Sequence, residues 1–390
     1  MNEHVIAAAK LTRAEHAAGM AAYQREGLRL ARAIDNRGRL RFDSEGRLHQ
    51  DILAAYRRHG FYIFERVVDA AEIAALRRDI DSMLDRAPVD RGARVDAKGR
   101  PALGLDYARS PYTFVKPLAD PWGGTGLLNG RHPSQMSQPA PDAGAPDDVV
   151  FLIYGMCQAM PAGLRLYGHP RLLAVAASIN GDDFVPYNDA IFVKQPGLGG
   201  SVAWHQDGVT HWESPDWDDG IHGFNFQVQL YPTTAGNGLW IVPGTHKAGR
   251  IDIKRRIADN AGSEQLPGAI PLICEAGDVT LVNRQMLHGS FANTSADPRV
   301  SITFGFHRRR SVLGAKAALG VVNEDVVYDE QRIFERAAVI AVAIDARRQA
   351  YPDESSFIYQ PFAGQENDFR FNEQTFETVI RDYNVKDLAI

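Results

Sequence analysis

The sequence predicts a mainly β core of the sandwich or barrel type, with helical segments on either side of it. From about residue 184 the chain consists of short runs of β-branched and aromatic residues separated by Gly, Pro, Asn and Asp, which is typical of all-β folds. Before and after this region, apolar residues recur at helical spacing instead. With no internal repeat and no Gly/Ser-rich linker, we expect one domain over residues 1–390 with its β core at 184–310.

The N-terminal part, residues 1–130, is predicted to form a buttress of helices and one strand. Up to about residue 58 the chain is rich in Ala, Arg and Glu with scattered apolar positions, which suits helices packed outside a larger core. The aromatic and β-branched run 60–64 predicts a strand. A capping-box pattern at Asp69 then precedes apolar residues at helical spacing as far as Leu84, which predicts an amphipathic helix.

The rest of the chain divides into a loop, the β core and a helical tail. Residues 131–148 are rich in Pro, Gly, Ser, Gln and Asp, a composition that breaks regular structure and predicts a loop. The predicted core strands are 190–195, 202–206, 224–231, 238–242, 270–274, 278–283 and 300–307. Apolar residues at helical spacing, from Ile333 and again from Phe376, predict a helical C-terminal extension over 325–390.

Composition and charge are those of an ordinary globular enzyme. The chain is 45% hydrophobic and 23% charged, and its net charge of -5 gives no basic field for nucleic acid or anionic lipid. The two cysteines, Cys157 and Cys274, form neither a disulfide framework nor a metal-binding spacing, which favours a reducing compartment. Because we find no signal-peptide core and no stretch long enough for a membrane span, we expect a cytoplasmic protein. The oligomeric state is not determined by the sequence.

Three residues of the core have the types and positions of a mononuclear iron site. His205 and Asp207 are two residues apart, so on a strand both side chains point to the same face. His288 follows the β-type run 278–283 and would supply a third ligand from a neighbouring strand. Two imidazoles and one carboxylate are the ligands of a non-haem Fe(II) site that leaves positions open for O2 and substrate. A His-x-Asp spacing alone also occurs by chance, so the surrounding motifs decide the interpretation.

These motifs resemble the phytanoyl-CoA dioxygenase family of Fe(II)- and 2-oxoglutarate-dependent oxygenases. The resemblance rests on Trp204-His-Gln-Asp207, on Asn237-Gly-Leu-Trp-Ile-Val-Pro-Gly-Thr-His246, and on the small, polar and basic residues at fixed offsets after His288. It covers about residues 184–308 and extends more loosely to 55–85. It implies a double-stranded β-helix, also called a jelly roll or cupin-like barrel, with helical extensions before and after it.

The resemblance also implies a role for each motif residue. His205, Asp207 and His288 would bind Fe(II), and Arg299, eleven residues after the distal histidine, would bind the far carboxylate of 2-oxoglutarate. A guanidinium suits this task because it is a planar fork that pairs with a carboxylate through two hydrogen bonds and stays charged. Ser290 matches in place a family hydroxyl that contacts the cosubstrate, although a serine in a turn would have no such role.

Further candidate residues line one predicted strand and one loop. The polar residues Asn225, Gln227 and Gln229 alternate, so they share one face, which suits a polar cavity better than an apolar core. We expect Gln227 to contact the cosubstrate, although family members often carry an aromatic or small hydroxyl residue nearby. Asn225 and Gln229 are expected at the substrate, and Trp212 would either stack on the substrate or anchor its loop.

The implied activity is hydroxylation, or another oxidation, of an unactivated C–H bond of a small molecule, with release of succinate and carbon dioxide. Family halogenases replace the metal carboxylate by a small residue, so Asp207 favours hydroxylation. Two alternatives remain at this point. A cupin-type metal oxygenase independent of 2-oxoglutarate leaves Arg299 unexplained, and a non-catalytic metal- or ligand-binding barrel would bind without consuming oxygen. The sequence determines neither the substrate nor the choice among hydroxylation, desaturation and cyclisation.

Overall fold

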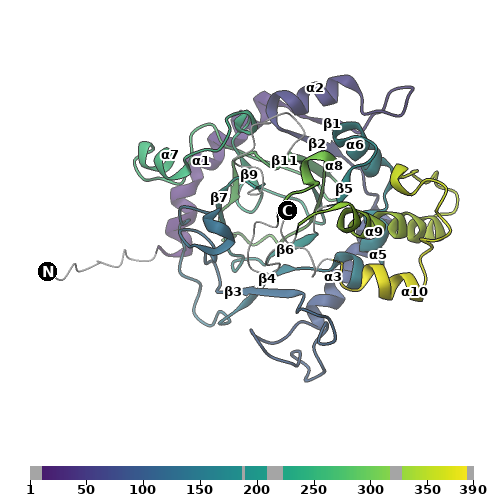
Figure 1. The fold of residues 1–390 in the computed structure, drawn as a ribbon. Coiled ribbons are helices and arrows are strands. Elements are labelled where there is room, and N and C mark those ends of the chain that lie inside the picture. The colour runs from purple at the N-terminus through teal and green to yellow at the C-terminus, as the bar shows by residue number, and fades with distance from the viewer. Residues whose placement is uncertain (1–10, 187–188, 209–222, 317–326, 384–390) are drawn as a thin grey trace.

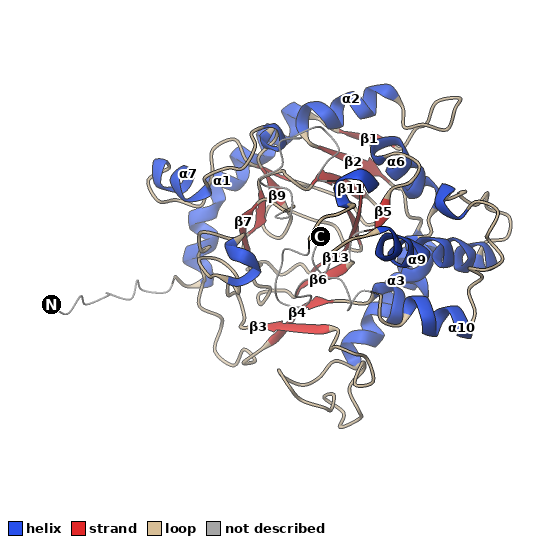
Figure 2. Cartoon of the chain, in the orientation of Figure 1, coloured by secondary structure: helices blue, strands red, loops and turns tan. Residues whose placement is uncertain are grey.

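The computed structural model describes residues 11–186, 189–208, 223–316 and 327–383, and it contains two β-sheets with helices around them (Figures 1 and 2). The larger sheet has the strand order β1 (Arg37–Arg39), β2 (Phe61–Glu65), β11 (Val279–Asn283), β8 (Phe224–Gln229), β13 (Arg299–His307), β6 (Ala190–Lys194), β4 (Val149–Ile153) and β3 (Tyr112–Val115), with β5 (Val185–Pro186) also paired to β13. The smaller sheet has the order β10 (Ile270–Pro271), β9 (Trp240–Ile241), β12 (His288–Ser290) and β7 (Val202–His205). The predicted β core with flanking helices is thus confirmed.

Helices occupy the predicted regions on both sides of the core. The α-helices are α1 (Arg13–Ile34), α2 (Gln50–His59), α3 (Ala70–Asp85), α4 (Met156–Ala159), α5 (Pro161–Tyr167), α6 (Pro170–Asn180), α7 (Ile253–Asp259), α8 (Arg309–Val312), α9 (Glu330–Ala350) and α10 (Glu373–Thr375). Short 3-10 helices are η1 (Leu127–Gly130), η3 (Thr245–Lys247) and η4 (Gln360–Phe362), and η5 (Phe376–Ile380) is a π-helix. No helix in the described ranges is long and apolar enough to cross a membrane.

Helix α1 packs closely against the smaller sheet because its residue at the contact, Gly27, has no side chain. A Cβ at Gly27 would lie 2.6 Å from the ring of Trp240 on β9, so a larger residue there would push the helix away. One turn earlier, Tyr23 stacks on the same ring at a centroid distance of 4.6 Å. On the opposite side of the molecule, α5 contacts both α3 and α9, so N-terminal and C-terminal helices meet beside the larger sheet (Figure 1).

The strands β3 and β4 are absent from the sequence prediction, although they extend the larger sheet beyond β6. All five residues of β4 are buried, so the strand reads as a continuous apolar run without alternation. Such a run does not distinguish a buried strand from a buried helix by its period. Near the C-terminus, the predicted helical spacing from Phe376 belongs to the π-helix η5.

A buried histidine next to α6 provides a test of this packing. His169 is 3% exposed, and burial, together with nearby Arg347 and Arg171, lowers its pKa to about 3. Its ordinary pKa is 6.5, so the neutral imidazole contributes stability above that pH, and this contribution is lost as the pH falls from there toward the folded pKa. Lowering the pH from about 7.5 to 5.5 should reduce the free energy of unfolding of both proteins. The reduction should be about 1.4 kcal/mol smaller in His169→Gln than in the wild type. Urea unfolding at both pH values measures the difference, and an identical pH dependence would contradict it.

Candidate functional site

The three predicted metal ligands converge in the structure. His205 on β7 and His288 on β12 are directly opposite in the antiparallel ladder, with ring centroids 4.0 Å apart. Asp207 follows β7, and its backbone N–H donates to the carbonyl of Arg284. Its carboxylate oxygens lie 3.6 Å from Nε2 of His205 and 3.8 Å from Nε2 of His288. One donor atom from each residue lies within 4.8 Å of the others, a spacing that suits a single metal ion.

Both imidazoles are oriented so that one nitrogen faces the candidate metal position. Nδ1 of His205 lies 2.8 Å from the carbonyl oxygen of Ala203, and Nδ1 of His288 lies 2.7 Å from that of Met286. Because a carbonyl only accepts, each Nδ1 carries the proton and each Nε2 presents its lone pair. Burial lowers the pKa of both histidines, so they are neutral and able to bind a cation near neutral pH.

The third ligand, Asp207, is held by a cation and an amide. Nη1 of Arg131 donates to one carboxylate oxygen at 2.7 Å, and Nδ2 of Asn225 donates to the other at 3.0 Å. Burial alone would raise the pKa of Asp207, but Arg131 and the two histidines hold it well below its ordinary value. The carboxylate therefore stays charged. Two neutral imidazoles and one charged carboxylate on one side of a cavity fit a non-haem Fe(II) ion.

A buried arginine faces this triad from the larger sheet. Arg299 on β13 is 1% exposed, its Nη2 donates to Oε1 of Gln227 at 3.2 Å, and its Nε has no hydrogen-bond partner. Burial lowers its pKa to about 10, which still leaves the guanidinium charged at neutral pH. In the described part of the chain no carboxylate forms an ion pair with it. Because an unpaired buried charge costs several kcal/mol, this position suits an anionic ligand such as a carboxylate.

One cavity of about 340 Å³ connects the metal triad to Arg299. The smaller sheet supplies the triad side of its wall, through β7 and β12, and the larger sheet supplies the opposite side, through β8 and β13. Ser290 and Gln227, the two further residues expected at the cosubstrate, line the same cavity. Both are almost fully buried, at 1% and 7% exposure. The site therefore lies between the two sheets of the barrel, where little water would reach it.

The three residues expected at the substrate are placed differently from one another. Asn225 lines the cavity, but its side chain donates to Asp207 and so supports the metal carboxylate. Gln229 is 2% exposed at the far end of β8 and is not among the residues that line the cavity. The strand carries the alternation that the sequence predicts, but the cavity ends before Gln229. Trp212 lies outside the described residues.

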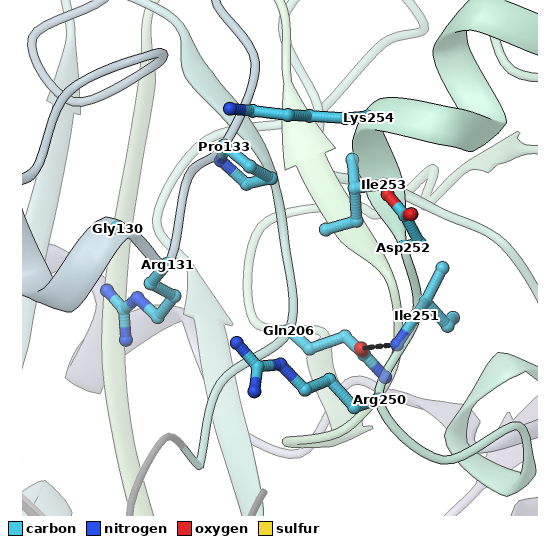
Figure 3. Close-up of a pocket in the computed structure, with 9 residues that line it drawn as sticks. All are labelled: Gly130, Arg131, Pro133, Gln206, Arg250, Ile251, Asp252, Ile253 and Lys254. Atoms are coloured by element: carbon cyan, nitrogen blue, oxygen red, sulfur yellow. Dashed lines mark hydrogen bonds between the residues drawn. The ribbon is translucent and has the colours of Figure 1, made fainter.

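Gln206, the residue between His205 and Asp207, supports the site from the side away from the metal cavity. Gln206 accepts a hydrogen bond from the N–H of Ile251 at 2.8 Å, drawn as the dashed line in Figure 3, and donates to the carbonyl of Gln285 at 2.8 Å. It also lines a second cleft of about 290 Å³, together with Arg131 and Lys254 (Figure 3). Arg131 therefore lies on the wall between this cleft and the metal cavity, since it lines both.

Arg131 is the part of the site that the sequence does not reveal. It opens the predicted loop 131–148 and is 76 residues from Asp207, so no motif spacing links the two. The preceding residues Leu128 and Asn129 have φ angles of 52° and 56°. A left-handed backbone costs a residue such as leucine about 1 kcal/mol. Backbone strain of this kind persists where surrounding contacts hold it, often at functional sites.

Buried neighbours hold the loop that carries Arg131. His132 is fully buried and packs against His205, with ring centroids 4.2 Å apart. The carboxylate of Asp120 accepts hydrogen bonds from the backbone N–H groups of Gly123 and Met136, at 2.9 and 2.8 Å. This carboxylate closes the loop on both sides of Arg131. The start of the predicted loop is therefore an ordered part of the metal site.

Comparisons with known proteins identify the family of this chain. The model of the phytanoyl-CoA dioxygenase (PhyH) family matches residues 56–301, which includes the stretch 86–183 where the motifs alone show no resemblance. Phytanoyl-CoA dioxygenase 1 of Oryza sativa subsp. japonica is 31% identical over 117 residues, which are 28% of this chain and 40% of the rice protein. Phytanoyl-CoA dioxygenase of Arabidopsis thaliana is 23% identical over 267 residues, 65% of this chain and 87% of that protein.

Among solved structures, EctD from S. alaskensis with 2-oxoglutarate and 5-hydroxyectoine aligns with 19% identity and a TM-score of 0.48, over 74% of this chain and 87% of its own. The family match covers more than half of the chain and includes all three metal ligands and Arg299. The protein therefore belongs to the phytanoyl-CoA dioxygenase family of non-haem iron, 2-oxoglutarate-dependent dioxygenases.

Proposed function

We propose that this protein hydroxylates an unactivated C–H bond of a small-molecule substrate, using Fe(II), O2 and 2-oxoglutarate, and releases succinate and carbon dioxide. One observation carries the proposal. The metal triad and the unpaired, buried Arg299 face one cavity from opposite sheets. A metal site without an anionic cosubstrate would leave that arginine as an uncompensated buried charge.

Each residue has a defined task in this proposal. His205, Asp207 and His288 would hold Fe(II) on one side, which leaves its other side toward the cavity. Arg299 would pair with the far carboxylate of 2-oxoglutarate, and Gln227 would keep the guanidinium in place through its hydrogen bond. When bound, the iron supplies the activation of O2, while the protein supplies orientation and a cavity that excludes water.

Hydroxylation is favoured over halogenation because the carboxylate ligand is present and firmly held. Asp207 receives hydrogen bonds on both oxygens, from Arg131 and from Asn225. These contacts keep the carboxylate at the metal position, so a halide would find no vacant ligand site there. Desaturation or cyclisation would start from the same removal of a hydrogen atom from the substrate.

A succinate assay tests the proposal and separates its alternatives. The protein is loaded with Fe(II) and 2-oxoglutarate without oxygen, exposed to oxygen with panels of small molecules, and succinate is measured. We expect oxygen-dependent succinate that requires both Fe(II) and 2-oxoglutarate. Oxidation of a substrate without 2-oxoglutarate would favour the cupin-type oxygenase instead. Metal and ligand binding without oxygen consumption would favour the non-catalytic barrel.

We also propose that the chain acts as one domain, in the cytoplasm, on small molecules rather than nucleic acid. Cys157 and Cys274 are free and buried, which supports a reducing compartment. The net charge of -5 supports the absence of a nucleic-acid partner.

A further inference from the structure

The charges around the metal cavity do not balance once its expected contents are counted. The charged carboxylate and guanidinium residues that line it, among those described, are Arg109, Arg131, Asp189, Asp207 and Arg299. A divalent metal and the 2-oxoglutarate dianion would cancel each other. The carboxylate of Asp207, which pairs with Arg131, offsets one of the three arginine charges. The two arginine charges that remain face a single carboxylate, that of Asp189.

The carboxylate of Asp189 is already engaged within the protein. It accepts hydrogen bonds from the backbone N–H groups of Gly155 and Met156, at 3.1 and 2.9 Å, and from the hydroxyl of Tyr383. Burial raises its pKa to about 6, which still leaves it largely charged at neutral pH. Asp189 therefore neutralises at most one of the two arginines.

Arg109 and Arg131 both line the cavity, and neither is fully paired with the described residues. Arg109, just before β3, is partly buried and forms no ion pair or hydrogen bond with any described residue. Arg131 uses Nη1 on Asp207, but its Nε is buried and has no hydrogen-bond partner. A cation that shares its carboxylate partner with a metal ion is only partly compensated, so an additional anion nearby would be favourable.

Much of the remaining wall of the cavity is apolar. The residues concerned are Trp122, Leu128, Leu152, Phe192, Val202 and Leu239. This lining suits a carbon skeleton, which is also the part of the substrate that the proposed reaction oxidises. The cavity of about 340 Å³ has to hold both cosubstrate and substrate, so the substrate would be small.

We propose that the substrate is a small organic anion with an apolar carbon skeleton, whose carboxylate or phosphate group is bound by Arg109 and Arg131 in front of the metal triad. This inference rests on the proposed function. The apolar residues would place the carbon to be oxidised beside the metal, and the arginines would fix which carbon that is.

Binding to the full-length protein loaded with Mn(II) and 2-oxoglutarate tests the inference without turnover. The carboxylate probes are octanoate and 3-phenylpropanoate, and the phosphate probes are hexyl phosphate and phenyl phosphate. Octanamide, 3-phenylpropanamide, hexanol and phenol are the uncharged counterparts. Isothermal titration calorimetry is expected to show at least one anion that binds about tenfold or more tightly than its neutral counterpart. The set of probes that binds shows whether the anionic group is a carboxylate or a phosphate ester.

Charge-removing variants identify the residues responsible. Arg109→Gln and Arg131→Gln should each weaken the anion by about tenfold while leaving the neutral counterpart unchanged. Arg255→Gln is the matched control, because Arg255 is a highly exposed arginine on α7 that does not line the cavity. Mn(II) affinity is measured for each variant, since Arg131 also contacts the metal carboxylate.

The outcomes distinguish the two proposals. If 2-oxoglutarate does not bind to the Mn(II)-loaded protein, the proposed function fails and the substrate inference fails with it. If 2-oxoglutarate binds but no anionic probe binds more tightly than its uncharged counterpart, only the substrate inference is overturned. A preference for anions that survives both arginine substitutions would overturn it as well.

Discussion

Replacement of Asp207 by alanine is expected to abolish succinate release. The substitution removes one of three protein ligands and leaves two imidazoles that hold a divalent ion weakly. It also leaves the guanidinium of Arg131, whose side chain is 11% exposed, without its carboxylate partner. We expect a loss on the order of 10³-fold or more in kcat/KM, equivalent to about 4 kcal/mol. The measurement is succinate formed per enzyme at saturating Fe(II), together with a Co(II) titration of the same protein.

A matched substitution controls for the loss of a carboxylate in general. Asp252 is exposed and accepts a hydrogen bond from the N–H of Arg255 at the start of α7, so Asp252→Ala removes the same group outside the metal cavity. This control should keep full turnover and Co(II) binding. Hydroxylation retained in Asp207→Ala would remove the basis of the iron assignment.

Replacement of Arg299 by glutamine is expected to weaken 2-oxoglutarate binding by about 10²-fold, which corresponds to about 3 kcal/mol. The guanidinium is 1% exposed and hydrogen-bonds only to an amide among the described residues, so its charge is available to the cosubstrate. The 2-oxoglutarate affinity of Arg299→Lys should lie between those of the wild type and Arg299→Gln, because lysine keeps the charge but lacks the planar fork. Calorimetric titration of 2-oxoglutarate into Mn(II)-loaded protein measures the affinity of the wild type and of both variants.

Two further observations make the Arg299 experiment specific. Mn(II) affinity should not change, since Arg299 is not one of the three ligands. The protein without cosubstrate should melt at an equal or higher temperature in Arg299→Gln, because the variant removes an unpaired buried charge. Unchanged 2-oxoglutarate binding in this variant would contradict the pairing of Arg299 with the cosubstrate carboxylate.

The candidate metal ligands were predictable because their signals are local. His205 and Asp207 lie at strand spacing, and His288 directly follows a β-type run. The position of Arg299 after His288 carried the family resemblance, which the family match over 56–301 confirms. The fold class was predictable for the same reason, since short β-type runs and turn residues repeat within a few positions.

Contacts between distant segments were not predictable in this way. Arg131 contacts Asp207 only because an ordered loop, closed by Asp120, brings it to the cavity. The strand alternation correctly places Asn225 and Gln227 at the cavity, but it does not indicate where the cavity ends, and Gln229 falls outside it. Similarly, nothing local in the sequence marks Arg109 as a neighbour of the metal site.

The sequence by itself determined the β core, the metal-binding residue types and the family, because these depend on periods and spacings along the chain. Only the tertiary structure decided that Arg131 and Asn225 hold the carboxylate of Asp207 and that Arg109 lines the same cavity as Arg131. The physical reason is that the free energy of a buried charge depends on the groups that surround it in three dimensions. Loop closure and sheet packing set those surroundings, and they bring together residues that share no pattern in the chain.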